Sequence, residues 1–236
     1  MIKAVFFDLY NTLVDYDPPR EELQAATLRQ MGMEAEPEAL RRAIQVADQF
    51  YYEESARLPV QKRSAAEKTD LYAEYQSKVL AGVGIKVTKE VALQVLARFG
   101  AMLRQSGAKL VLFPDVVPAL AQLKSRGLTL GLITNVDRDM SPTFDELGLS
   151  SYLDFMVISF ELGVAKPDPA IFRAALERAA AKPAEAIHVG DQYHADVLGA
   201  RRAGIKPLLL DRDNFNPQFT DCIRISSLEE VVRHLQ

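Results

Sequence analysis

Apolar residues recur along the chain with two different periods, and the change of period divides it into sections. From about residue 111 to the end, short apolar runs alternate with longer amphipathic stretches. Apolar runs of four to six residues are too short for buried helices and are typical of strands buried on both faces of a parallel sheet. We expect such strands at residues 3–8, 128–133, 155–158, 186–189 and 207–210.

Helix signals fill the gaps between these runs. Residues 116–126 have an amphipathic pattern, and Asp168 followed by Pro169 is an N-cap with proline at the first helical position. Ser227 with Glu230 has the spacing of a capping box and predicts the start of a last helix. Strands that alternate with helices in this way predict an α/β fold with a doubly wound, mostly parallel sheet.

Residues 16–105 show the other period. They are rich in charge, contain little strand signal, and repeat apolar residues every three or four positions, which predicts helices. We therefore expect an all-helical cap domain at residues 16–105, inserted into a Rossmann-like core made of residues 1–15 and 106–236 and placed over the strand ends. The apolar positions at helical spacing are Leu40, Ile44, Ala47 and Tyr51, then Leu71, Tyr75 and Val79, then Val91, Val95, Phe99 and Met102.

The net charge and the cysteine content limit which binding partners and which cellular compartment are expected. A net charge of -4 gives no basic field for nucleic acid or anionic lipid, so neither partner is expected. The single cysteine, Cys222, forms no internal disulfide, which fits a reducing compartment. We see no basic leader before an apolar segment and no apolar run near the roughly 20 residues that span a bilayer, so we expect a cytoplasmic protein.

Acidic residues stand where the predicted strands end. Asp8 closes the first apolar run, and Asp191 and Asp196 follow the run at residues 186–189. In a doubly wound sheet the ligand crevice lies beyond the carboxyl ends of the strands, where Thr134 would also fall. Three carboxylates at such a crevice predict a site for a hard divalent cation such as Mg²⁺.

Four motifs in order carry a family resemblance that covers essentially the whole chain. Together, and with a helical insert between the first and the second, they resemble the haloacid dehalogenase-like hydrolase superfamily, in its subgroup with a helical cap after the first motif. The motifs are Asp8-Leu9-Tyr10-Asn11-Thr12, Leu132-Ile133-Thr134-Asn135, Lys166-Pro167-Asp168-Pro169, and Gly190-Asp191 followed by Asp196.

The resemblance implies a hydrolase with a covalent intermediate. Asp8 stands at the position of the aspartate that attacks phosphorus, or occasionally carbon, to form an aspartyl intermediate that water hydrolyses. The metal ligands it implies for Mg²⁺ are Asp8, the backbone carbonyl of Tyr10, Asp191 and, with less support, Asp196. Lys166 would neutralise charge on both Asp8 and the transferred group.

The same resemblance implies the substrate contacts. The Thr134 hydroxyl and the Asn135 backbone amide would hold the phosphoryl oxygens together with Lys166, and Thr12 would contribute to substrate binding from the first motif. The substrate implied is a small molecule, a phosphorylated metabolite or a 2-haloacid.

The first motif departs from the phosphatase pattern at Tyr10. Phosphatases of the superfamily have a second aspartate there, which protonates the leaving group and later activates water. Tyrosine has a reference pKa of about 10, so it donates a proton but is seldom ionised to act as a base. General acid-base catalysis is worth roughly 10²–10⁴ in rate, and slow phosphatase turnover is therefore expected.

Three functions stay open on the sequence. The first is Mg²⁺-dependent hydrolysis of a small phosphorylated metabolite. The second is 2-haloacid dehalogenation, for which Tyr10 is characteristic, although those dehalogenases have Ser-x-Asn where this chain has Gly190-Asp191. The third is a homologue of low activity that binds a metabolite or a protein.

Overall fold

The computed structural model describes residues 1–136 and 140–236. The chain divides into two compact units: a core unit of Met1–Asp15 with Leu110–Gln236, and a helical unit of Tyr16–Lys109. The strands β2 (Val14–Asp17) and β3 (Lys109–Leu112) form a two-stranded sheet where the chain passes from one unit to the other.

The core unit is built on a six-stranded parallel sheet. Its strands are β1 (Ala4–Phe7), β4 (Thr129–Thr134), β5 (Phe155–Ile158), β6 (Ala186–Gly190), β7 (Lys206–Leu210) and β8 (Ile223–Ile225). Their order is β5-β4-β1-β6-β7-β8, so the first strand of the chain lies in the middle and later strands are added on both sides. The predicted doubly wound α/β class is confirmed.

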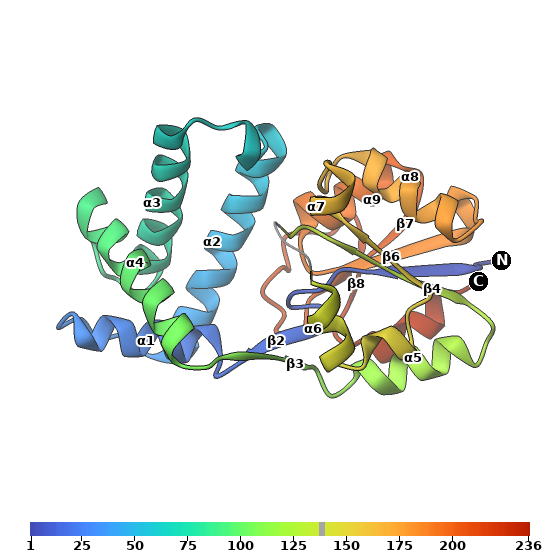
Figure 1. Cartoon of the computed structure of the whole chain (residues 1–236), viewed down its shortest axis with the longest axis horizontal. Helices are drawn as coiled ribbons and strands as arrows, with labels where there is room; N and C mark the ends of the chain where they lie inside the picture. The colour runs from blue at the N-terminus through green and yellow to red at the C-terminus, as the bar shows by residue number, and fades with distance from the viewer. Residues whose placement is uncertain (137–139) are drawn as a thin grey trace. The chain divides into compact units, whose positions relative to one another are not determined.

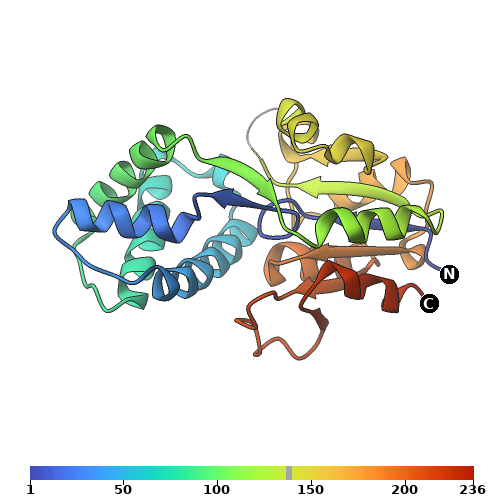
Figure 2. The same cartoon turned by 90° about the horizontal axis from the view of Figure 1, so that it is seen from below.

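Helices cover both faces of this sheet (Figures 1 and 2). The helical segments of the core unit are α5 (Val116–Lys124), α6 (Ser141–Glu146), η2 (Leu149–Ser151), α7 (Ser159–Leu162), α8 (Pro169–Arg178), η3 (Pro183–Glu185), η4 (Tyr193–Val197), α9 (Leu198–Arg202) and η5 (Leu228–His234). Strand β1 alternates between the two layers, because Val5 and Phe7 pack in a cluster with α5 and η5, whereas Phe6 packs in a cluster with α8 and α9. The sheet is thus buried on both faces, as its apolar runs predict.

The end of the chain differs from the prediction. Residues 228–234 form a 3₁₀-helix, and no capping box begins it, because the Glu230 carboxylate accepts from the Ser226 amide, 2.8 Å away. The Ser227 hydroxyl accepts from the Glu229 amide at 3.2 Å and donates to Asp115 at 2.9 Å. This long-range contact with Asp115 is invisible to a local spacing rule.

The helical unit consists of α1 (Arg20–Gln30), α2 (Pro37–Arg57), α3 (Ala65–Gly82), α4 (Lys89–Gln105) and a short 3₁₀ turn, η1 (Val60–Lys62). The apolar periods that predict helices bring Leu40, Ile44, Val79 and Val95 into one buried cluster. Ser64 caps α3 in a capping box with Glu67. In the part of the chain that the structure describes, none of the helices has the length and apolar character needed to cross a membrane.

Gly131 in the middle of β4 makes room for an aromatic pair. It lies in register with Phe6 on β1 and with Phe155 on β5. The two rings meet edge to face across it, with centroids 5.9 Å apart. A Cβ atom at this position would lie 2.5 Å from Cζ of Phe155, closer than van der Waals contact allows.

We expect Gly131→Ala to destabilise the protein by about 1–3 kcal/mol, because the added methyl group overpacks this part of the core. The control is Gly100→Ala in α4, where the new Cβ would lie 3.5 Å from an Arg104 nitrogen and the helix gains up to about 1 kcal/mol. Urea unfolding followed by circular dichroism measures both. Equal midpoints for the two variants would contradict the packing argument.

Candidate active site

Three neighbouring strands bring the predicted site residues to one edge of the sheet. Asp8 directly follows β1, Thr134 ends β4, and Asp191 directly follows β6. Strand β1 is paired with β4 on one side and with β6 on the other, and all three run in parallel. Because paired strands lie about 4.8 Å apart, the residues at their carboxyl ends lie close together.

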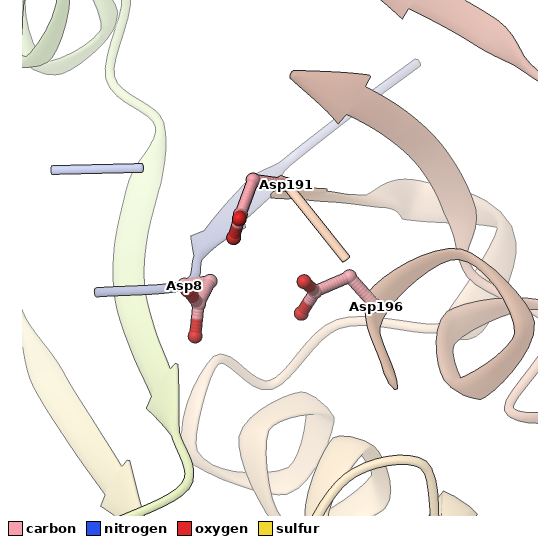
Figure 3. Close-up of side chains that lie close together, drawn as sticks. All are labelled: Asp8, Asp191 and Asp196. Atoms are coloured by element: carbon pink, nitrogen blue, oxygen red, sulfur yellow. The ribbon is translucent and has the colours of Figure 1, made fainter. Parts of the chain in front are cut away.

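Asp8, Asp191 and Asp196 form a buried carboxylate cluster. One oxygen of each lies within 4.8 Å of the others, and the residues are 8%, 6% and 1% exposed, respectively. Figure 3 shows the three side chains converging on a common space from β1, from the loop after β6 and from the helical turn that follows it. This is a donor set of hard oxygens, suited to Mg²⁺.

Lys166 supplies the positive charge inside this cluster. Its ammonium group donates to Oδ1 of Asp8 and, at 2.7 Å, to Oδ1 of Asp196. The Lys166 side chain is 2% exposed, so both contacts are shielded from water. The lysine thus holds carboxylates from two distant parts of the chain next to each other.

Asp196 reaches the cluster from η4, a π-helical turn, the kind of local irregularity often found at functional sites. Its carboxylate also contacts His188 Nε2 at 2.8 Å and accepts from the Gln192 amide at 3.0 Å. The turn can fold back against β6 because residue 190 is glycine: a Cβ there would lie 2.2 Å from Cγ of Asp196.

Asp191 is oriented by two amide side chains. Gln192 Nε2 donates to its Oδ2 at 2.6 Å, and Asn11 Nδ2 donates to the same oxygen at 3.2 Å. Asn11 has a φ of 57°, the left-handed conformation that asparagine tolerates in turns. The turn after β1 is therefore tied to the loop after β6 by the side chain next to Tyr10.

Asn135 supports Lys166 from the end of β4. Its Nδ2 donates to the Lys166 carbonyl at 2.9 Å, and its Oδ1 accepts from the Lys166 amide at 2.8 Å. Ser159 braces the next residue, because its hydroxyl donates to the Val136 carbonyl at 2.8 Å and accepts from the Val136 amide at 2.9 Å. The side chain of Asn135 is thus committed to Lys166; its backbone amide is the atom that the family resemblance assigns to the substrate.

Two buried hydroxyl groups complete the set. Among the described residues, neither Thr12 Oγ1 nor Thr134 Oγ1 has a hydrogen-bond partner, and both threonines are at most 1% exposed. A buried hydroxyl without a partner is unfavourable unless a ligand or water supplies one. Tyr10 is partly buried, packs against the core cluster and bridges to Val14 across the turn.

Burial and neighbouring charges set the protonation of the cluster. Burial raises the pKa of Asp8 to about 6, with Lys166 opposing the rise and Asp196 adding to it. Burial likewise disfavours ionised Asp196, but the Lys166 ammonium and the His188 hydrogen bond keep its pKa well below the usual range. Despite its burial, Lys166 has a raised pKa because Asp196 and Asp8 flank it. At neutral pH, Asp8 is a mostly ionised carboxylate beside a charged lysine.

The sequence pattern indicates no site role for His188, Gln192, Ser159 or Asn11. His188 lies on β6 with 0% exposure, and burial lowers its pKa, so the neutral ring donates from Nε2 to Asp196. A histidine in the middle of an otherwise apolar strand is the one signal that could have identified it.

We expect the Asp8 carboxyl group in metal-free protein to titrate with a pKa of about 6. Asp196→Asn should lower this pKa because it removes a neighbouring negative charge, and Lys166→Met should raise it because it removes the cation. Carboxyl ¹³C NMR in chelator-treated buffer measures the titration. Asp168→Asn, a change in the N-cap of α8, is the control and should leave it unchanged. An Asp8 pKa below 4 would contradict the assignment of burial as the main cause.

One curated relative matches along the whole chain. It is a glyceraldehyde 3-phosphate phosphatase from Methanopyrus kandleri, 32% identical over an alignment that covers 100% of this chain and 99% of the relative. The alignment therefore includes both units of the fold.

Solved structures with the same fold include a 2-haloacid dehalogenase from Pseudomonas syringae, with a TM-score of 0.55, 30% identity, and coverage of 100% of this chain and 98% of that one. A second is the HAD-hydrolase YfnB from Bacillus subtilis, with a TM-score of 0.66, 19% identity, and coverage of 100% and 99%. A family model for haloacid dehalogenase-like hydrolases matches residues 2–204. The chain therefore belongs to the haloacid dehalogenase-like hydrolase family.

Proposed function

We propose that this protein is a Mg²⁺-dependent phosphohydrolase that cleaves a small phosphorylated metabolite through an aspartyl-phosphate on Asp8. The observation that carries the proposal is the buried cluster itself: the Asp8 carboxylate in contact with the Lys166 ammonium, with oxygens of Asp191 and Asp196 within 4.8 Å. Phosphoryl transfer to a carboxylate requires a nucleophile and positive charge beside it, and the two further acids, Asp191 and Asp196, can hold a metal ion.

The charges of the cluster favour a divalent cation. Three carboxylates and one ammonium leave two formal negative charges among these four buried groups. Bound by Asp8, the Tyr10 carbonyl and Asp191, Mg²⁺ would offset this charge and that of an incoming phosphate. Asp196 has three protein donors already, so we assign to it mainly the task of holding Lys166 and the loop.

Asp8 is suited to attack without a general base. Its pKa of about 6 leaves it mostly ionised at pH 7, yet raised enough to make it more basic than an exposed aspartate. Lys166 donates to Oδ1 of Asp8 and so orients the carboxylate, which leaves Oδ2 to attack phosphorus. The same ammonium lies where it can neutralise a phosphoryl oxygen.

The buried hydroxyls of Thr12 and Thr134, and the backbone amide of Asn135, are the phosphate contacts of this proposal. The phosphoryl oxygens would give the two hydroxyl groups the partners that they lack within the described residues. The relative from Methanopyrus kandleri, a phosphatase, supports the substrate class. In this proposal the helical unit is the family's cap domain, whose side chains select the rest of the substrate.

Tyr10 determines which substrates turn over well. With tyrosine at the acid-base position, leaving groups that need no proton, such as acyl or aryl phosphates, are favoured over alkyl phosphates. The water that hydrolyses the aspartyl intermediate also lacks a carboxylate base from this position. We therefore propose a slow phosphatase with a preference for good leaving groups.

Dehalogenation of a 2-haloacid is the second candidate, and Tyr10 favours it. A departing halide needs no proton, and the relative from Pseudomonas syringae is a 2-haloacid dehalogenase that is 30% identical. Asp191 and Asp196 argue against dehalogenation, because without a metal ion these carboxylates repel both the anionic substrate and the attacking Asp8.

We expect the wild-type protein to release phosphate from p-nitrophenyl phosphate or acetyl phosphate only with Mg²⁺, and Asp8→Asn to lose at least about 10³ of that rate because the nucleophile is gone. A malachite green assay, with and without chelator, measures it. Asp168→Asn, an equally conservative change near Lys166, should keep full activity.

The dehalogenase alternative is tested with the same proteins. Halide release from 2-chloropropionate that persists with chelator and disappears in Asp8→Asn would replace the phosphatase proposal. Turnover of neither substrate, with retained affinity for inorganic phosphate in calorimetry, would favour the binding homologue.

We expect Tyr10→Asp to raise turnover of an alkyl phosphate such as glycerol phosphate by about tenfold or more, because it restores a carboxylate for proton transfer. The matched control is Tyr10→Asn, because asparagine has the same size as aspartate but no acid-base function. This variant should show no gain. Steady-state kinetics at saturating Mg²⁺ measures both. A gain shared by the two variants would mean that the bulk of tyrosine, not its proton chemistry, limits the reaction.

A further inference from the structure

Arg212, just beyond β7, makes a two-point ion pair that lies outside the carboxylate cluster. Its Nη1 donates to Oδ2 of Asp115 at 2.8 Å, and its Nη2 donates to Oδ1 of the same carboxylate at 3.0 Å. The two side chains are 17% and 14% exposed. A bidentate pair with this much shielding fixes the guanidinium plane.

The same guanidinium reaches the turn of the first motif. Nη2 of Arg212 also donates to the backbone carbonyl of Thr12 at 2.8 Å. Its Cζ lies 4.1 Å from the centroid of the Phe113 ring, a cation-π contact. The Phe113 amide in turn donates to the Leu13 carbonyl at 3.1 Å. One side chain thus joins the segments just before the chain leaves the core unit and just after it returns.

Within the turn at residues 9–14, backbone amides donate to backbone carbonyls of the same turn. The Thr12 carbonyl instead accepts from a residue outside the turn. Leu13 and Val14 both donate to the Leu9 carbonyl, at 2.8 and 3.0 Å, and Asn11 donates to the Val14 carbonyl at 2.8 Å. Arg212 donates to the Thr12 carbonyl, at the same residue whose buried hydroxyl lacks a partner among the described residues.

Asp115, the ion-pair partner of Arg212, is held in place by contacts that do not involve the turn. Asp115 accepts from the Ser227 hydroxyl and from the Leu228 amide, each at 2.9 Å. These contacts orient the carboxylate from the last helical segment of the chain. Arg212 therefore connects a fixed anchor to a turn that carries Tyr10 and Thr12 beside the nucleophile.

We propose that Arg212 is a positioning residue for the reaction: by holding the Thr12 carbonyl against the Asp115 anchor, it fixes the turn of residues 10–13 relative to Asp8. A displacement of such a turn by about 1 Å is enough to lower a rate by roughly 10²-fold. The kinetic part of this inference rests on the proposed phosphatase function.

The test compares Arg212→Lys with Arg224→Lys. Arg224 also pairs with a buried aspartate of the core unit, Asp211 at 2.9 Å, but it holds the loop after β7 and not the first-motif turn. In Arg212→Lys we expect kcat for p-nitrophenyl phosphate with Mg²⁺ to fall about tenfold or more, with KM within about threefold. Hydrogen exchange of residues 9–14 should become faster. Arg224→Lys should change neither kcat nor the hydrogen exchange of residues 9–14.

Each outcome decides the inference. A wild-type kcat in Arg212→Lys, or an equal fall of kcat in Arg224→Lys, would overturn it, because the pair would then serve stability alone. If Arg212→Lys does not fold, Asp115→Asn takes its place: it can still accept from Ser227 and Leu228 but loses the charged bidentate pair, and it should show the same split between kcat and KM.

The result is separable from the fate of the proposed function. Wild-type protein that releases no phosphate contradicts the function, and the role of Arg212 is then decided by hydrogen exchange in residues 9–14. Faster exchange in Arg212→Lys but not in Arg224→Lys supports the inference, and unchanged exchange in Arg212→Lys overturns it.

Discussion

The contact of one buried ammonium with two buried carboxylates is the interaction on which this site depends. Two like charges about 4 Å apart repel by roughly 4 kcal/mol at an effective dielectric constant of about 20. Lys166 lies between Asp8 and Asp196 and makes their burial tolerable. Its removal would leave uncompensated charges in the interior, which is far less favourable than the absence of the whole cluster.

That constraint explains the polar groups around the cluster. The ammonium must be placed accurately, and the Asn135 side chain does this through both polar groups of the Lys166 backbone. Asp196 must be held in its ionised form, and His188 and the Gln192 amide each donate to it. Even Gly190 belongs to this set, because any larger residue would displace Asp196. The family's motifs are thus one electrostatic unit spread over distant segments.

The large features of the fold follow from local patterns in the sequence. Short apolar runs indicate β1, β4, β5, β6 and β7, and doubly wound topology then places the polar residues after β1, β4 and β6 at one edge of the sheet. What could not be predicted depends on contacts far apart in sequence. The last helix is 3₁₀ and lacks its capping box, because Glu230 accepts from the Ser226 amide, and Ser227 also donates to the distant Asp115.

The site shows the same division. Asp8, Asp191 and Lys166 stand in motifs with fixed spacing, so their proximity could be proposed from the sequence. The contact of Asn11 with Asp191 could not be predicted, because it joins residues 180 positions apart. Arg212 carries no local signal at all: its partners at Thr12 and Asp115 become neighbours only when the sheet is assembled.

The frame of the turn after Asp8 consists mainly of backbone hydrogen bonds. The turn is held by its own amides, by the left-handed conformation of Asn11, and by Arg212 through the Thr12 carbonyl. None of these three supports involves the side chain at position 10. Asp8, Lys166 and the other acids of the cluster can therefore keep their positions when the residue at position 10 changes. On such a frame, any chemistry that depends on the side chain at position 10 can vary without a change of fold.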